Sequence, residues 1–165
     1  MPPPKPSVKN YFKNQKAVNK CRARFQKEVK LGRMIGGVGW TRATVKWFLG
    51  SLGREFYTTP FGAVPKNDDP LGRIIHDFSF PSKTKESINS ALINTSVKYI
   101  SFVERARQLS KVDWYIKVDL KNGYRQLGVH PSEWHTQVYT LGDREYFIDL
   151  NMPFGKANSS KIFCR

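Results

Sequence analysis

The 165-residue sequence predicts an α+β fold, with helices and β-hairpins in separate stretches of one domain or of a substantial piece of a larger one. Residues 14–31 carry apolar side chains at helical spacing. Residues 61–78 and 137–150 each contain two strand-like runs separated by turn residues, and a helix followed by a strand is expected at 101–120. This order lacks the regular strand–helix alternation that builds a doubly wound parallel sheet.

The first helix is expected from Asn14 to Leu31, with Val18, Cys21 and Phe25 on one face and Gly32 as its stop. Its remaining surface is basic and consists of Lys16, Lys20, Arg22, Arg24, Lys27 and Lys30. Two interpretations of this surface stay open, a solvated charged face and a face that contacts nucleic acid.

One glycine-rich stretch and one pair of aspartates could be taken for a phosphate loop and a metal site, but the neighbouring residues favour structural roles. Residues 36–39 (GGVG) look like a phosphate loop but lack its lysine and the dinucleotide-binding spacing, so we expect a flexible connection before a short amphipathic helix at 45–52. Asp68 and Asp69 lie between the strand-like runs 61–64 and 73–78, where Pro70 favours a plain turn over a metal site.

The run 113–120 follows a helix whose start is marked by the capping-box spacing of Ser101 and Glu104. It alternates like a strand, which predicts a core face formed by Trp114, Ile116, Val118 and Leu120. Asp119 then projects from the less apolar face at the strand end. By itself it is either a cap of the turn that follows or a catalytic carboxylate. The final hairpin, 137–141 with 144–150, is expected to turn at Gly142-Asp143.

Charge is the strongest global signal. The chain has 28 Lys and Arg residues against 13 Asp and Glu, a formal net charge of +15, which favours binding of a polyanion such as RNA or DNA. The alternative is a ribosomal-type or merely soluble basic protein.

The cysteines and histidines set further bounds. Two cysteines and three histidines show no disulfide framework and no zinc-ligand spacing. No apolar run reaches membrane-spanning length, so we expect an intracellular protein, cytoplasmic or nuclear, with no membrane partner.

Four stretches, in this order, resemble the reverse transcriptases of retroelements. EVKLGR (28–33) leads into TPFGAVPKNDDPLGRIIHDFSFP (59–81) with SIN (87–89), which resembles the fingers hairpin. KVDLKNGYRQLGVHP (117–131) resembles the first conserved palm motif, an Asp followed five residues later by Phe or Tyr, and MPFGKANSSKIF (152–163) resembles the loop and helix that cradle the incoming nucleotide. The likeness is greatest to the DIRS-like (tyrosine recombinase) and gypsy-like elements.

The resemblance implies a right-hand polymerase fragment, that is, a fingers hairpin plus a truncated palm. We expect the chain to divide into a disordered proline-rich tail (1–13), a basic helical N-terminal segment (14–53), fingers (54–100), the first part of the palm (101–130), a fingers insertion hairpin (131–150) and a truncated palm helix of the nucleotide pocket (151–165).

The resemblance also assigns roles in two-metal nucleotidyl transfer. Asp119 would bridge two Mg²⁺ (or Mn²⁺) ions with help from the Leu120 carbonyl, since Mg²⁺ takes carboxylate and carbonyl oxygens. Lys66 and Arg73 would clamp the triphosphate of a deoxynucleotide, although by themselves both are ordinary solvated charges of a hairpin.

The pocket residues follow from the same resemblance. Tyr124 would lie beneath the sugar and exclude a 2′-hydroxyl, or it is a core tyrosine, and the two roles are compatible. Phe154 and Gly155 would form the pocket floor. Lys156 and Ser160 depart from the family, which usually has Leu and Pro at these positions.

The family's Asp-Asp motif does not occur after Asp119, where the acids are Glu133, Asp143, Glu145 and Asp149. We therefore expect part of an RNA-directed DNA polymerase, inactive alone, whose partners are an RNA or DNA primer–template and deoxynucleoside triphosphates. The alternative is a non-catalytic basic nucleic-acid-binding fragment retained from a retroelement.

Overall fold

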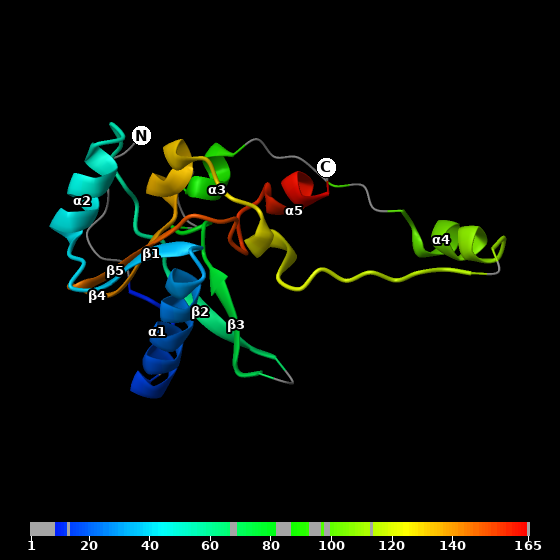
Figure 1. Cartoon of the computed structure of the whole chain (residues 1–165), viewed down its shortest axis with the longest axis horizontal. Coiled ribbons are helices and arrows are strands. Elements are labelled where there is room, and N and C mark those ends of the chain that lie inside the picture. Colours follow the sequence, from blue (N-terminus) through cyan, green and yellow to red (C-terminus); the bar gives the residue numbers. More distant parts are fainter. Residues whose placement is uncertain are drawn as a thin grey trace.

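The computed structural model describes residues 9–12, 14–66, 69–81, 87–92, 97, 100–112 and 114–164, with the backbone alone at 65–66 and 69–73. The described residues form two small antiparallel sheets with helices around them (Figure 1). The predicted mixture of helices and hairpins is therefore confirmed. No described helix combines the length and the apolar character that crossing a bilayer requires.

Helices are present where the sequence predicts them, at 14–31, near 45–52, after Ser101 and within 152–163, and a short helix near residue 88 and two 3₁₀ helices were not predicted. They are α1 (Gln15–Lys30), α2 (Arg42–Gly50), α3 (Ile88–Ala91), α4 (Phe102–Leu109) and α5 (Ser159–Phe163), with short 3₁₀ helices η1 (Gly123–Gln126) and η2 (Pro131–Thr136). The Asn14 side chain caps α1 by accepting from the Ala17 N–H at 2.9 Å. Ser101 likewise accepts from the Glu104 N–H at 3.1 Å and starts α4 as the sequence predicts.

The larger sheet has the order β1 (Met34–Val38), β5 (Glu145–Asp149) and β4 (Val138–Gly142), all antiparallel. The prediction of a flexible connection at 36–39 is wrong, because residues 34–38 pair with β5. Gly36 has a φ of +116°, and a Cβ there would lie 2.2 Å from the Tyr146 carbonyl oxygen. Glycine thus permits the close approach of the two strands.

The smaller sheet is the hairpin of β2 (Phe61–Lys66) and β3 (Asp69–His76), paired from Phe61 opposite His76 to Lys66 opposite Asp69. This confirms the predicted hairpin with longer strands, and its turn at 67–68, with Asp68, lies outside the described residues. The β4–β5 turn falls at Asp143-Arg144, one residue later than predicted, because Gly142 still pairs with Glu145.

Two apolar clusters cover the two faces of the larger sheet. Alternate residues of β5 point to opposite faces, so Phe147 joins one cluster while Tyr146 and Ile148 join the other. The first cluster packs α1 and the hairpin against the sheet and contains Cys21, Phe25, Met34, Phe61, Ile74, Phe78, Tyr139 and Phe147. The second packs α2 on the other face and contains Val45, Leu49, Phe56, Val138, Tyr146 and Ile148. Figure 1 shows α1 and α2 on opposite sides of this sheet.

An arm made of α4 and the extended residues 114–120 projects from the sheets (Figure 1). The predicted strand with a core face is wrong, because no described strand pairs with 114–120 and its apolar side chains are exposed. An alternating sequence predicts which side chains share a face of a strand. It does not predict whether the edge of another strand lies close enough to pair with it.

Candidate functional site

A hollow of about 430 Å³ lies where the arm meets α5 and the loop before it. It is lined by Val118, Asp119, Leu120, Gly123, Tyr124, Phe154, Phe163 and Cys164. Its volume is in the range of small-ligand pockets, and most of its lining is apolar. Four of the predicted site residues, Asp119, Leu120, Tyr124 and Phe154, are thereby brought together from two distant stretches of the chain.

Tyr124 is held at one wall by both packing and a hydrogen bond. Its ring centroid lies 5.0 Å from that of Phe154 and 5.1 Å from that of Phe163. The Tyr124 hydroxyl and Ser160 Oγ form a 2.9 Å hydrogen bond, in which either oxygen can donate. Ser160, where the reverse transcriptases that the sequence resembles often have Pro, therefore fixes the ring, and Tyr124 both packs and lines the hollow.

The loop that carries Phe154 is anchored by the end of β3 and by Asn89. Gly155 has a φ of +103°, and a Cβ there would come 2.2 Å from the His76 carbonyl oxygen, so the loop passes close to the end of β3. Asn89 Nδ2 donates to the Gly155 carbonyl at 3.0 Å, and Asn89 Oδ1 accepts from the Ala157 N–H at 2.9 Å. Gly155 thus has a structural role here, because it lets the loop close against the hairpin.

Asp119 is the one acidic side chain among the described residues that line the hollow. Its carboxylate is exposed, and the neighbouring Leu120 carbonyl accepts from the Gly123 N–H at 3.1 Å with one lone pair remaining. No group of three His, Cys, Asp or Glu side chains able to hold a metal occurs in the described part of the chain. One carboxylate and a carbonyl still fit Mg²⁺, which often takes one or two carboxylates and fills its shell with water and substrate phosphates.

For Lys66 and Arg73, the residues predicted to bind the triphosphate, the structure describes the backbone alone. Lys66 ends β2 and Arg73 stands opposite Val64 in β3. The side chains of both residues lie outside the described part of the structure, so their role stays a prediction.

The basic residues of α1 have different surroundings. Lys16, Lys27 and Lys30 are exposed, whereas Lys20 is half-buried. Arg22 donates to Glu145, with Nε 2.7 Å from Oε1 and Nη2 2.8 Å from Oε2, and this hydrogen-bonded pair raises the Arg22 pKa. Arg24 lines a small cavity of about 50 Å³ together with Arg125 and Asp149. The exposed lysines are the better-placed members of the predicted nucleic-acid face.

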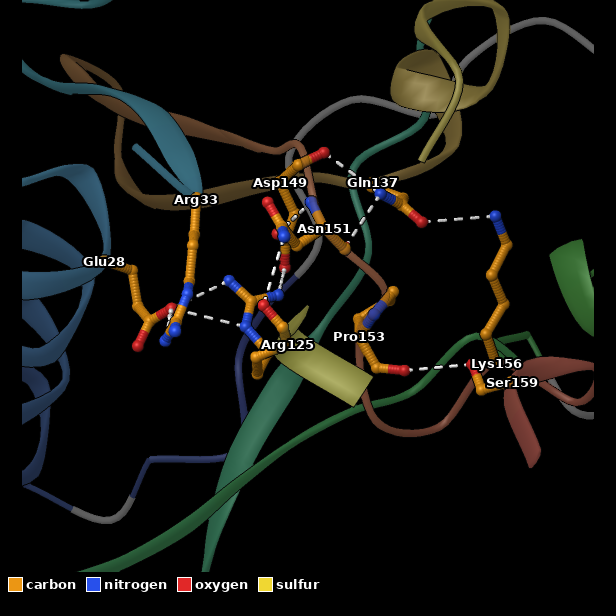
Figure 2. Close-up of polar contacts among 9 residues, drawn as sticks. All are labelled: Glu28, Arg33, Arg125, Gln137, Asp149, Asn151, Pro153, Lys156 and Ser159. Carbon is orange, nitrogen blue, oxygen red and sulfur yellow. Dashed lines mark hydrogen bonds and ion pairs between the residues drawn. The ribbon is translucent and has the colours of Figure 1, made fainter. Parts of the chain in front are cut away.

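An ionic network, missed by the sequence reasoning, lies behind the site (Figure 2). Arg125, the neighbour of Tyr124, contacts Asp149 Oδ2 at 2.5 Å and Glu28 Oε2 at 3.0 Å. Asp149 is fully buried, and burial raises its pKa to about 6 although Arg125 acts in the opposite direction. The network joins η1 to α1 and β5. The available signal was Asp149 itself, an acid between Ile148 and Leu150 in a stretch that is apolar from Tyr146 onward.

Lys156 points away from the hollow. Its ammonium donates to Thr136 Oγ1 and Gln137 Oε1, both at 3.2 Å, and burial lowers its pKa. Gln137 in turn donates to the Asp149 carbonyl at 3.0 Å, as Figure 2 shows. Lys156, where the reverse transcriptases that the sequence resembles usually have Leu, is therefore accommodated by polar partners in the last residue of η2 and in the residue between η2 and β4.

Comparison with solved structures gives a fold likeness over nearly the whole chain. A foamy viral protease–reverse transcriptase in complex with double-stranded DNA aligns with a TM-score of 0.61 and 16% identity over 99% of this chain and 26% of that chain. The native prototype foamy virus protease–reverse transcriptase aligns with a TM-score of 0.59 and 20% identity over 99% of this chain and 19% of that chain. The fold is thus a reverse transcriptase-related one.

Sequence comparison gives a likeness to viral polyproteins over a shorter stretch. The genome polyprotein of Petunia vein clearing virus (isolate Shepherd) is 30% identical over 97 residues, which are 59% of this chain and 4% of the polyprotein. The isolate Hohn polyprotein gives the same values. No protein-family model matches. The chain therefore spans only a small part of the polyproteins and of the solved structures that it matches.

Proposed function

We propose that the chain is the fingers and first palm portion of a retroelement reverse transcriptase, of the DIRS-like or gypsy-like kind that its motifs resemble. The observation that supports this most is the convergence of Asp119, Leu120, Tyr124 and Phe154 on one hollow. The reverse transcriptase-related fold supports it independently.

In this proposal the hollow takes a deoxynucleoside triphosphate. Asp119 and the Leu120 carbonyl would hold Mg²⁺ or Mn²⁺, which when bound neutralises phosphate charge and lowers the pKa of the attacking hydroxyl. The Tyr124 ring lies beneath the sugar and excludes a 2′-hydroxyl, while Lys66 and Arg73 bind the triphosphate.

Activity requires more acidic groups than the described part of the hollow supplies. Two Mg²⁺ ions bound at working affinity need further carboxylates beside Asp119. We therefore expect residues 1–165 alone to leave a primer unextended in the presence of Mg²⁺ and deoxynucleotides, and robust extension that survives Asp119→Asn would refute the metal assignment.

The deciding experiment is calorimetric titration of the chain with a deoxynucleoside triphosphate, with and without Mg²⁺. Asp119→Asn should weaken the Mg²⁺-dependent binding about 10- to 100-fold, the range expected for losing a charged contact. Asp143→Asn is the matched control, because Asp143 is an exposed acid in the β4–β5 turn. Equal affinities for the two variants would overturn the proposal.

The second candidate is a non-catalytic nucleic-acid-binding fragment, which the net charge of +15 and the exposed lysines of α1 favour. Both candidates bind nucleic acid. The alternative is therefore distinguished by binding of RNA or duplex without any Mg²⁺-dependent binding of deoxynucleotides.

A further inference from the structure

Arg125 connects three elements behind the hollow. Its guanidinium lies 2.5 Å from Asp149 Oδ2 in β5 and 3.0 Å from Glu28 Oε2 in α1, and Figure 2 shows it directed at both carboxylates. The Asp149 side chain is fully buried and the Arg125 side chain is 11% exposed. Because Arg125 directly follows Tyr124 in η1, these contacts act on the short helix that forms one wall of the hollow.

Polar contacts, rather than apolar packing, fix η1 against the larger sheet. The residues of η1 are half-buried or exposed, and the described members of the two apolar clusters come from other elements. Asn151 Nδ2 donates to the Arg125 carbonyl at 3.1 Å, and the Asn151 N–H donates to Asp149 Oδ1 at 3.1 Å. Arg125 is therefore held at the end of β5 through both its side chain and its backbone.

A cavity lies beside this contact. Arg125 and Asp149 line the cavity of about 50 Å³ together with Phe154, which also lines the hollow. Side chains that border empty space have fewer packing contacts to hold them in place. Without the guanidinium, η1 can therefore relax towards this space, and such a shift would change the 5.0 Å separation of the Tyr124 and Phe154 rings.

We propose that Arg125 is a positioning residue, whose contacts with Asp149 and Glu28 hold η1 so that the Tyr124 ring stays where it excludes a 2′-hydroxyl. This inference rests on the proposed function, because it gives Arg125 a part in the same nucleotide site. Arg125 is engaged by two carboxylates and acts on the nucleotide through Tyr124. A displacement of about 1 Å in a positioned group can change a rate about 100-fold, so a small shift of η1 is enough to weaken the selection of the sugar.

Selectivity between two nucleotides separates positioning from mere stabilisation of the fold. When part of the protein is unfolded, the apparent Kd of every ligand rises by the same factor. The ratio of the Kd for a ribonucleoside triphosphate to the Kd for the matching deoxynucleoside triphosphate is therefore independent of the folded fraction. A displaced Tyr124 ring would instead admit the 2′-hydroxyl and lower this ratio.

Calorimetric titration with ATP and with dATP, in the presence of Mg²⁺ at pH 8, measures the ratio. Arg125→Met should lower it at least about tenfold relative to the original chain. Leu49→Ala is the matched control, because Leu49 is fully buried in the second apolar cluster, on the other face of the larger sheet. It should destabilise the protein to a similar extent and change the ratio by less than about twofold.

A double variant keeps the test decisive if Arg125→Met folds poorly. Arg125→Met/Asp149→Asn changes both partners of the buried pair, which costs less than removing one of them. It should regain stability but keep the low ratio, since no guanidinium then joins η1 to β5. Recovery of the ratio together with stability would overturn the positioning role.

The same titrations in a Tyr124→Val background show whether Arg125 acts through Tyr124. Tyr124→Val removes the ring that Arg125 is proposed to position. Adding Arg125→Met to it should then change the ratio by less than about twofold, because the two substitutions affect selectivity through one group. A further tenfold fall would show that Arg125 acts on the nucleotide by another route, and it would contradict the proposal.

Failure of the proposed function gives a different result from failure of the positioning role. If the original chain binds neither ATP nor dATP, the nucleotide site is refuted and the positioning role with it. If the original chain distinguishes the two nucleotides and Arg125→Met distinguishes them equally well, the positioning role alone is overturned. A ratio near one in the original chain would also overturn it, because Tyr124 would then exclude nothing.

Discussion

Removing Arg125 tests how much the ionic network of Arg125, Asp149 and Glu28 stabilises the fold. In Arg125→Met the fully buried Asp149 carboxylate loses its 2.5 Å ion pair, while Glu28 keeps only the Arg33 contact at 3.8 Å. Breaking a buried pair from one side typically costs about 3–5 kcal/mol, because an uncompensated charge stays in the interior. For a chain of this length that corresponds to a fall in Tm of about 6–20 °C.

The loss of stability caused by Arg125→Met should depend on pH, and the raised pKa of Asp149 determines whether it grows or shrinks as pH rises. Folded Asp149 titrates at about 6 and an ordinary aspartate at 3.8, so between these values the folded protein binds the additional proton. The stability linked to this group is therefore fully present below about pH 4 and is lost as pH rises through about 6, by about 3 kcal/mol. Without Arg125 the pKa rises further, so the variant should lose little relative to the original chain at pH 5 and the full amount at pH 8.

Urea denaturation at pH 5 and pH 8, followed by tryptophan fluorescence, measures both effects. Arg33→Met is the matched control, because its 3.8 Å contact leaves Glu28 paired with Arg125, and it should cost less than about 1 kcal/mol. Adding Asp149→Asn to Arg125→Met should recover stability at pH 8. The reasoning is refuted if the single variant is equally destabilised at both pH values, or if the double variant is no more stable than the single one.

Three further predictions test the surface, the pocket and the sheet. Fluorescence anisotropy should show affinity for RNA or primer–template duplex that falls steeply with salt, and neutralising Lys16, Lys27 and Lys30 should reduce the log–log slope by up to about 3; a flat salt dependence would contradict this. In a longer protein that supplies the remaining carboxylates, Tyr124→Val should raise the kcat/KM for ribonucleotides far more than it changes the kcat/KM for deoxynucleotides. Tyr124→Phe should leave the ratio of these two constants unchanged. It should lower the unfolding free energy by about 0.5–1.5 kcal/mol, because the hydrogen bond to Ser160 is lost. An unchanged ratio in a destabilised Tyr124→Val protein would make Tyr124 a packing residue alone. Gly36→Ala should lower the unfolding free energy by more than about 2 kcal/mol, since its Cβ would lie 2.2 Å from the Tyr146 carbonyl oxygen. Gly50→Ala in α2 is the control, because its Cβ would meet open space, and it should stabilise the protein by up to about 1 kcal/mol. Equal effects of the two substitutions in thermal melts would contradict the close approach of β1 to β5.

Local patterns in the sequence predicted the local elements well. The apolar spacing of Val18, Cys21 and Phe25 and the stop at Gly32 were enough to predict α1, because helix formation depends on neighbours within one or two turns. The hairpins followed from turn residues between alternating runs. The prediction that 114–120 has a core face failed, because burial depends on a partner that the alternation itself does not specify.

The site was predicted in part, and for a different reason. Asp119, Leu120, Tyr124 and Phe154 were proposed by resemblance, and the structure brings them to one hollow. The contact of Arg125 with Asp149 was not predicted, since it joins residues 24 positions apart across two elements and leaves no periodic trace. Lys156 was recognised as a departure from the family, but its partners Thr136 and Gln137 could only come from the fold.

The Lys156 contacts also restrict the order in which substitutions at positions 137 and 156 can accumulate during evolution. An apolar residue at 156, as in the reverse transcriptases that the sequence resembles, would leave the fully buried Gln137 Oε1 without its donor, whereas replacing Gln137 first would leave the ammonium with Thr136 alone. Either single step removes one partner of a buried polar contact, which costs more than exchanging both together. Positions 137 and 156 should therefore vary as a pair among descendants of this sequence, with most lineages retaining either both polar residues or neither.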